Sequence, residues 1–311
     1  MTAILENFDY IALLLSVAAA VVAGLRFLHM LQLEGYQTPM YLKWLKKNGF
    51  KDQLPLLLVF LICILLDGAL LFVSRSMGER LPVTTFLLGR AAVRLLYVGL
   101  IVFIAITWKK QPQKKPFARA KRLVAALAVI CIIICGYSLT VKTYGIVTPA
   151  QYLLLRMGMY LPALLLPYLV ALANLAMLPV ENAVKRHYFN DAKKKLDGRQ
   201  DVIRVGITGS YGKTSAKFIL GSMLSEKFSV LVPPHSYNTP MGLTRIIREM
   251  LTPEHQVFVA EMGARYVGDI EELCELVHPS IGLITSVGKQ HLETFGSLEN
   301  IINTKYELIA S

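Results

Sequence analysis

The sequence predicts an α-helical membrane domain of about five transmembrane helices, followed by an incomplete α/β domain built on a parallel sheet. Three observations support this prediction. Long apolar segments occupy about the first 180 residues, and short apolar strands alternate with amphipathic helices in the rest. A glycine-bearing turn joins the first strand to the first of those helices. The composition of the 311 residues, 54% hydrophobic and 17% charged, is the average of these two unlike parts.

Five apolar segments are long enough to cross the hydrocarbon core of a bilayer as helices. They are Tyr10–Leu31, Leu54–Val73, Thr85–Trp108, Leu123–Val141 and Tyr152–Val180. The first is not expected to be a signal peptide, because Glu6 and Asp9 stand where basic residues would be required. Inside the second and third segments, we expect Asp67 to pair with Arg90 or Arg94 as a structural link, although an intramembrane charge is also a candidate functional site.

The distribution of Lys and Arg predicts the orientation of these helices. The loops expected after the first and third segments are strongly basic, whereas the N-terminus and the other two loops are not. The basic residues of the two loops are Lys43, Lys46, Lys47 and Lys51, and Lys109, Lys110, Lys114, Lys115, Arg119, Lys121 and Arg122. An outside N-terminus then places residues 181–311 in the cytosol, where ATP is found. The net charge of +12 suits membrane lipids, and we expect no nucleic-acid partner, because aromatic and basic residues are not interleaved in the second part.

The chain divides into a transmembrane domain over residues 1–182, a basic linker over 183–200 and an α/β domain over 201–311. The linker is expected to be a solvated helix that faces lipid headgroups. The expected strands beyond it are Val202–Thr208, Ser229–Val232, Gln256–Ala260 and Ile281–Ser286. The expected helices are Lys213–Lys227, Gly242–Leu251, Gly268–Val277 and Leu298–Ala310. This alternation predicts a parallel sheet in a three-layer arrangement.

The turn after the first expected strand has the features of a phosphate-binding loop. Backbone N–H groups and a helix N-terminus bind anionic oxygens, a lysine adds charge, and a hydroxyl can reach Mg²⁺. The spacing departs from G-x-x-x-x-G-K-[ST], because Ile207 stands where the first glycine is required, and a plain glycine-rich turn is the alternative. The residues expected to bind the phosphates are Thr208, Gly209, Ser210, Tyr211, Gly212, Lys213, Thr214 and Ser215.

Two further strands end in residues suited to phosphate or metal chemistry. Glu261 follows the third expected strand, and His291 lies in the loop after the fourth. Ligands of such sheets bind beyond the carboxyl ends of the strands. We therefore expect Thr214, Glu261 and His291 to hold Mg²⁺ against nucleotide phosphates. Taken singly, Glu261 is also typical of helix capping, and His291 of a protein surface.

These motifs together resemble the central ATP-binding domain of the Mur ligases. ITGSYGKTS (207–215) resembles their phosphate-binding loop, which has the same displaced glycine, and SYNTPMGLT (236–244) is similar to their Asn- and Gly-rich segment. EMGARYVGDI (261–270) resembles their Glu-x-Gly motif, and TSVGKQHLETFGSLENIINTKYEL (285–308) their His-containing motif. The sequences HLETFGS and EMG are most similar to the family branch that adds D-alanyl-D-alanine to the UDP-muramoyl tripeptide. Tyr211, Ser215 and Ser286 stand where the family commonly has Asn, Thr and Asn.

The resemblance implies a role for each matching residue. Lys213 would bind the β- and γ-phosphates of ATP, and Lys305 matches a family lysine that is carbamylated by CO₂ and helps to hold a second metal ion. Without the resemblance, Lys305 is a surface lysine on an amphipathic helix. The implied catalytic residues are Lys213, His291 and Lys305. The implied ligands of up to two Mg²⁺ ions are Thr214, Glu261, His291 and Lys305. The implied substrate-binding residues are Asn238 and Thr239.

The implied function is ATP-dependent amide formation in peptidoglycan synthesis, through an acyl phosphate. The acceptor would be a UDP- or lipid-linked muramoyl peptide, the donor an amino acid or dipeptide, and the location the bacterial cell membrane, multi-pass, with a cytoplasmic ATP-binding domain. The alternatives are a related ligase for another envelope polymer such as poly-γ-glutamate, and a non-catalytic nucleotide-binding membrane scaffold. The family's N-terminal domain is not recognisable, and the sequence stops at Ser311 inside the sheet domain, so we expect a fragment of a longer ligase that is inactive alone.

Overall fold

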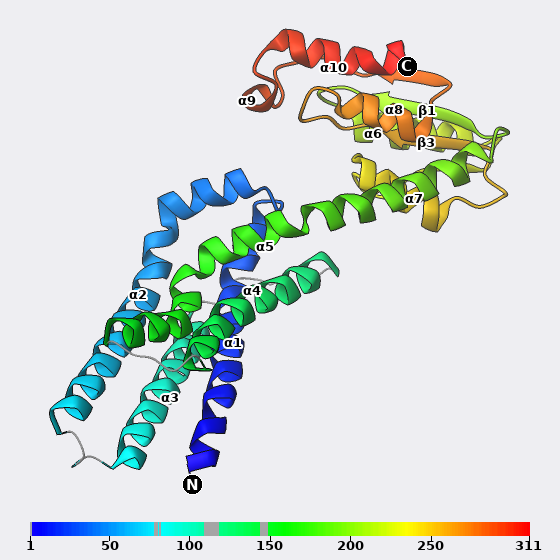
Figure 1. Cartoon of the computed structure of the whole chain (residues 1–311). Helices are drawn as coiled ribbons and strands as arrows, with labels where there is room; N and C mark the ends of the chain where they lie inside the picture. Colours follow the sequence, from blue (N-terminus) through cyan, green and yellow to red (C-terminus); the bar gives the residue numbers. More distant parts are fainter. Residues whose placement is uncertain (1, 78–79, 81, 109–117, 144–148) are drawn as a thin grey trace. The chain divides into compact units, whose positions relative to one another are not determined.

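The structure, a computed structural model, describes residues 2–77, 80, 82–108, 118–143 and 149–311 (Figure 1). It divides into two compact units, Met1–Glu181 and Asn182–Ser311. The first unit is helical, and the second is an α/β unit built on a parallel sheet. The basic residues Lys109, Lys110, Lys114 and Lys115, which contribute to the predicted orientation, lie outside the described residues.

The first unit places each predicted apolar segment in a helix. The helices are α1 (Thr2–Leu33), α2 (Thr38–Met77), α3 (Val83–Thr107), α4 (Ala118–Thr143) and α5 (Pro149–Asp197), whose end belongs to the second unit. Within the described residues, five helices are long and apolar enough to cross a membrane, by length and composition. Helix α1 packs against α3 and α4, and α2 packs against α3.

The first basic stretch was predicted as a loop, and this prediction is wrong. Lys43, Lys46, Lys47 and Lys51 lie inside α2, and only residues 34–37 separate α1 from α2. Helix α2 has 40 residues, which corresponds to about 60 Å, roughly twice the hydrocarbon thickness of a bilayer. Because lysine is a good helix former, the helix extends over a polar first third before the apolar run begins.

Buried polar groups of the first unit have partners in neighbouring helices. Asp67, which is 1% exposed, accepts a hydrogen bond of 2.7 Å from the Tyr160 hydroxyl, and Arg90 lies within coulombic range of the same carboxylate. The Arg122 guanidinium binds both carboxylate oxygens of Glu181, at 2.7 and 2.8 Å. These contacts join α5 to α2 and to α4, and so they fix the register of these helices.

The second unit contains, in its described residues, a four-stranded sheet with the order β2-β3-β1-β4 and all pairings parallel. Its strands are β1 (Ile203–Thr208), β2 (Val230–Leu231), β3 (Val257–Glu261) and β4 (Ile281–Ile284). Each lies within or beside its predicted range. Strand β2 has only two residues, because its pairing with β3 ends where the chain turns towards α7.

Helices cover both faces of this sheet, and Figure 1 shows α10 running alongside the strands. They are α6 (Lys213–Ser225), α7 (Pro240–Met250), α8 (Asp269–Val277), α9 (Leu292–Phe295) and α10 (Leu298–Ala310). One apolar cluster packs α6 against Val205, Ile207, Val257 and Val259. A second cluster packs α7, α8 and the end of α5 against Phe258 and Ala260. Successive side chains of a strand point to opposite faces, so the alternation along β1 and β3 produces the three layers.

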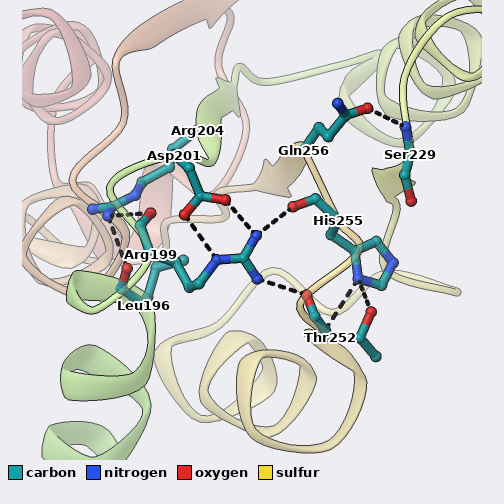
Figure 2. Close-up of polar contacts among 8 residues, drawn as sticks. All are labelled: Leu196, Arg199, Asp201, Arg204, Ser229, Thr252, His255 and Gln256. Carbon is teal, nitrogen blue, oxygen red and sulfur yellow. Dashed lines mark hydrogen bonds and ion pairs between the residues drawn. The ribbon is translucent and has the colours of Figure 1, made fainter.

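The segment predicted as a solvated linker is the last part of α5, and it packs into the second unit. Ala192 and Leu196 are fully buried in the second apolar cluster. Figure 2 shows how the guanidinium of Arg204, on β1, donates to the Leu196 and Arg199 carbonyls, at 2.8 and 3.3 Å. It also donates to the Val277 carbonyl at the end of α8. Because carbonyls at helix ends lack intrahelical partners, Arg204 caps two helices at once.

Arg199 adds a second set of contacts beside Arg204 (Figure 2). Its guanidinium binds the Asp201 carboxylate at 2.6 and 2.8 Å, and it donates to the carbonyls of Thr252 and His255, both at 2.8 Å. These contacts hold the end of α5 to the segment between α7 and β3. The C-terminal end of the basic stretch 183–200 is thus part of the α/β unit.

Candidate functional site

Three segments meet at one edge of the sheet, beyond the carboxyl ends of the strands. In the parallel register, Ile207 of β1 lies opposite Glu261 of β3, and Thr208 lies opposite Ile284 of β4. The strands therefore end at the same level. The loop after β1, the Glu261 carboxylate and the segment after β4 consequently lie next to one another, as the sequence predicts for a ligand site of this fold class.

The glycine loop, residues 209–212, needs glycine at both of its ends. Gly209 has a φ of 149°, and a Cβ there would lie 2.0 Å from the Thr285 hydroxyl oxygen. Gly212 has a φ of 80° and directly precedes α6. Both angles are unfavourable for residues with a Cβ. The loop can thus approach the segment after β4 closely, and this explains why glycine stands at these two positions although the usual spacing is not kept.

Hydrogen bonds hold the glycine loop in this conformation. The Ser210 amide donates to the Ser286 carbonyl at 2.7 Å, and the Tyr211 amide donates to the Ser286 hydroxyl oxygen at 3.0 Å. The buried Ser210 hydroxyl donates to the Gly288 carbonyl and accepts from the Gly288 amide. Ser286 and Gly288 therefore both tie the loop to the segment after β4.

The N-terminus of α6 is open to an anion. The helix begins at Lys213 directly after Gly212, so the amides of its first turn have no intrahelical partner. The Lys213 ammonium group turns back and donates to the loop carbonyls of Gly209 and Ser210, at 2.6 and 3.4 Å. Burial lowers the pKa of Lys213. An anion at this position would gain both the free amides and the lysine charge.

Glu261 is the most strongly held acidic group of the site. It is 1% exposed, and its Oε1 atom accepts hydrogen bonds from the Thr214 hydroxyl at 3.0 Å and from the Asn238 side-chain amide at 3.1 Å. The Oε2 atom lies 3.3 Å from the Lys217 ammonium nitrogen, but it accepts no hydrogen bond from the described residues. The Thr214 hydroxyl and the Glu261 carboxylate thus place oxygen ligands side by side. Thr214 and Glu261 therefore fit a Mg²⁺ ion, which prefers oxygen ligands.

The glycine of the Glu-x-Gly motif makes room for this arrangement. A Cβ at Gly263 would lie 2.9 Å from the side-chain carbon Cγ of Asn238. The Gly263 amide also donates to the Asn238 carbonyl at 2.8 Å. The close approach brings the Asn238 side chain within reach of Glu261. Glycine at this position thus permits the contact between the segment after β2 and the end of β3.

A basic cluster, which we define as Lys213, Arg265, His291 and Lys305, lies beside the glycine loop. Burial first, and then the charge of Lys213, lower the pKa of Lys305 to about 8. The pKa of His291 is also lowered, by burial first and then by the charges of Arg265, Lys213 and Lys305. The positive charges of this cluster repel one another, and a polyanion bound beside them would relieve that repulsion.

The predicted metal ligands are brought together only in part. Thr214 and Glu261 are in direct contact, whereas His291 and Lys305 lie within coulombic range of Lys213. Lys305 is 4% exposed, so it is not the surface lysine of the alternative interpretation. Among the residues that the structure describes, no three His, Cys, Asp or Glu side chains form a metal centre. A second metal site therefore stays a prediction.

The other predicted site residues have defined positions. The Thr208 hydroxyl is fully buried and donates to the Met262 carbonyl, which links β1 to β3. The Thr239 side chain accepts from the Gly242 amide and caps α7. Tyr211, in the glycine loop, and Ser215, in the first turn of α6, are both exposed. Asn238 points to Glu261, so of the two predicted substrate residues it is the one that belongs to the site.

The sequence reasoning missed Lys217. This residue is 0% exposed, pairs with Glu261 and donates a hydrogen bond to the His235 carbonyl. A signal was present, because Lys217 precedes Leu220 and Leu224 by three and seven residues and so stands on the apolar face of its helix. A lysine on a buried helix face requires a partner.

The comparison with known families agrees with the motifs. Residues 207–311 match the Mur ligase middle domain. The resemblance predicted from the motifs is therefore confirmed for this segment. A UDP-N-acetylmuramoyl-tripeptide–D-alanyl-D-alanine ligase of Mycobacterium tuberculosis (strain ATCC 25618 / H37Rv) is 41% identical over 104 residues, which are 33% of this chain and 20% of that protein. The ligase of the same name from Synechocystis is 38% identical over 106 residues, 34% of this chain and 23% of that protein.

The chain thus spans about a fifth of the length of the curated relatives that it matches. A solved structure is also similar, the MurF ligase from Thermotoga maritima in complex with ADP. It is 38% identical, with a TM-score of 0.38, over 40% of this chain and 29% of that one. The matched part of this chain contains the glycine loop, Glu261 and the basic cluster.

Proposed function

We propose that this chain provides the ATP-binding part of a membrane-anchored, ATP-dependent amide ligase of the Mur type, which acts in peptidoglycan synthesis. The observation that carries the proposal is the contact of Thr214 and Asn238 with the buried Glu261 carboxylate. This contact lies beside the Lys213 ammonium group, in a segment that matches the Mur ligase middle domain. A hydroxyl, a carboxylate and a lysine at a helix N-terminus are the groups that ATP and Mg²⁺ require.

The residues divide the work of nucleotide binding. The amides at the start of α6 and the Lys213 ammonium group would bind the phosphates, after Lys213 leaves the loop carbonyls that it contacts. Thr214 and Glu261 would hold a Mg²⁺ ion, and His291 with a carbamylated Lys305 would hold a second one. Mg²⁺ supplies neutralisation of the phosphate charge when bound. Lys305 suits carbamylation, because its lowered pKa leaves a larger neutral fraction at physiological pH.

The proposed reaction forms an amide in two steps. A carboxylate oxygen of the acceptor attacks the γ-phosphorus, the bond from that phosphorus to the ADP oxygen breaks, and an acyl phosphate forms. The nitrogen of the amine donor then attacks the acyl carbon, phosphate leaves, and the amine loses a proton. The protein contributes mainly position and charge, because Lys213 and the first turn of α6 face the oxygens on which negative charge collects.

The name of the relatives suggests the substrates. They are ligases for UDP-N-acetylmuramoyl-tripeptide and D-alanyl-D-alanine. We propose a muramoyl peptide as acceptor, delivered at the membrane, and D-alanyl-D-alanine as donor. Five candidate membrane helices precede the matched segment, which favours a lipid-linked acceptor over a soluble one. The location that we propose is the bacterial cell membrane, with an outside N-terminus and residues 182–311 in the cytoplasm.

Phosphate release from ATP tests the proposal. The full-length protein that contains this chain, in detergent, is mixed with D-alanyl-D-alanine and with either the UDP-linked or the lipid-linked muramoyl tripeptide, and phosphate and product are measured. We expect phosphate release only with a complete acceptor and donor pair, and at least a 100-fold lower rate for Lys213→Ala. Lys227→Ala, at an exposed lysine just beyond α6, is the matched control. A Lys213→Ala protein with the normal rate would contradict the site, and release with glutamate as donor would favour a different envelope polymer.

A further inference from the structure

Lys217 is a buried cation that the proposed reaction does not use. Its side chain is 0% exposed, although it lies only one helical turn after Lys213. The ammonium nitrogen lies 3.3 Å from Glu261 Oε2, and it donates a hydrogen bond to the His235 backbone carbonyl. A buried lysine requires compensation for its lost hydration. The two partners of Lys217 come from two different segments of the site.

The first partner is the carboxylate that we assign to the metal ion. Thr214 and Asn238 both bind Glu261 Oε1, so they hold one of the two carboxylate oxygens. Lys217 lies on the side of Oε2 and draws this second oxygen to a defined place. All three contacts together determine the plane of the carboxylate. An oxygen ligand must point correctly for the near-octahedral geometry of Mg²⁺.

The second partner belongs to the segment that carries Asn238. Residues 232–239, between β2 and α7, contain His235 with a φ of 56°, a left-handed conformation that is unfavourable for a residue with a side chain. The Lys217 ammonium group binds the carbonyl of this residue and so stabilises the turn. Asn238, three residues further, then reaches Glu261.

Close packing makes this contact possible. A Cβ at Gly221 of α6 would lie 2.5 Å from a Val232 methyl carbon, so the helix and the start of the 232–239 segment touch directly. Lys217 stands on the same face of α6 as Gly221, one turn earlier. Only a long side chain with a donor at its end can reach the His235 carbonyl and the Glu261 carboxylate together from that position.

We propose that Lys217 is a positioning residue, which holds the Glu261 carboxylate and the 232–239 segment in the geometry that a nucleotide-bound divalent cation requires. The proposal rests on the proposed function, because Glu261 acts on the cation only if the site binds a nucleotide with Mg²⁺. Lys217 itself takes no part in the chemistry and acts on the cation only through Glu261.

The test separates cation binding from nucleotide binding. The affinity of the full 311-residue chain for ADP is measured calorimetrically in detergent, once with Mg²⁺ and once with EDTA. The dissociation constant in EDTA divided by the dissociation constant with Mg²⁺ gives the Mg²⁺ ratio, which is larger when Mg²⁺ strengthens binding more. We expect Lys217→Met to lower this ratio about 10- to 100-fold, the usual effect of removing a group that orients a metal ligand. The affinity in EDTA should stay within about threefold, because Lys213 and the start of α6 are unchanged.

Two further variants make the outcome decisive. Lys227→Met removes an exposed lysine just beyond α6, and its Mg²⁺ ratio should equal that of the unchanged protein. Lys217→Gln keeps a donor for the His235 carbonyl but removes the charge beside Glu261, and it decides the question if the Met variant does not fold. We expect the Gln variant to lose the Mg²⁺ effect as well.

Three results would overturn the proposal. An unchanged or larger Mg²⁺ ratio in folded Lys217→Met or Lys217→Gln would show that Glu261 needs no such support. An equal loss of affinity with Mg²⁺ and with EDTA would show that Lys217 only stabilises the fold. A wild-type chain that binds no ADP under either condition would instead refute the nucleotide site itself, and the role of Lys217 with it.

Discussion

Replacing Gly209 by alanine should destabilise the α/β unit far more than the same change at Gly212. Both glycines have positive φ angles, 149° and 80°. A Cβ at residue 212 meets nothing within 4 Å, whereas a Cβ at residue 209 would lie 2.0 Å from the Thr285 hydroxyl oxygen and 3.1 Å from the Ser286 amide nitrogen. The pair of variants therefore separates backbone strain from steric overlap.

The magnitudes follow from these contacts. At Gly212 alanine costs only its left-handed conformation, about 1–2 kcal/mol. At Gly209 the conformational cost is about 1–3 kcal/mol. The Thr285 hydroxyl must also move, and it would give up its hydrogen bonds to the carbonyls of Tyr211 and Thr208, at 2.6 and 3.3 Å. The hydroxyl has one proton, which these two carbonyls share, so the loss is about 1 kcal/mol and the total for Gly209→Ala is about 2–4 kcal/mol.

Hydrogen exchange measured by mass spectrometry gives the free energy of opening for each part of the chain separately. We expect peptides from β1 and β3 to lose about 2–4 kcal/mol of protection in Gly209→Ala and about 1–2 kcal/mol in Gly212→Ala. Peptides from the first unit should be unchanged and serve as an internal control. Equal protection in the two variants would refute the argument that the close approach to Thr285 is what requires glycine at residue 209.

Two further predictions concern buried cations of the α/β unit. Arg204→Met should lower the protection of β1 by about 2–4 kcal/mol, because the carbonyls of Leu196, Arg199 and Val277 lose their donor. The control variant Arg245→Met, on an exposed helix surface, should change this protection by less than about 0.5 kcal/mol. For Lys305, whose pKa is about 8 in the folded protein against 10.5 in the unfolded chain, the unfolded state binds more protons between these two pH values. The free energy of unfolding should therefore rise from pH 8 to pH 10.5, and protection measured at both ends of that range should show a smaller rise in Lys305→Met. An equal rise in the variant, or an Arg204→Met protein as stable as Arg245→Met, would contradict the assigned burial.

Local patterns predicted the elements that have a clear period. Short apolar runs marked β1, β3 and β4, and amphipathic repeats marked α6, α8 and α10 to within a few residues. Helix α9, which has four residues, was not predicted, because a single turn has no periodicity that a sequence can show. The first third of α2 was taken for a loop because its lysines are polar, although lysine favours helix as long as solvent is available.

By itself, the sequence determined which segments are apolar enough for a bilayer, where the glycine loop lies, and which residue types follow each strand. These are properties of neighbours along the chain. Only the tertiary structure decided that β3 lies directly beside β1, and this order brings Glu261 to Thr214 and buries Lys217 against both Glu261 and His235. The physical reason is that strand order results from the packing of distant apolar surfaces, and a lysine on the apolar face of a helix reveals its partner only when the sheet beneath it is known.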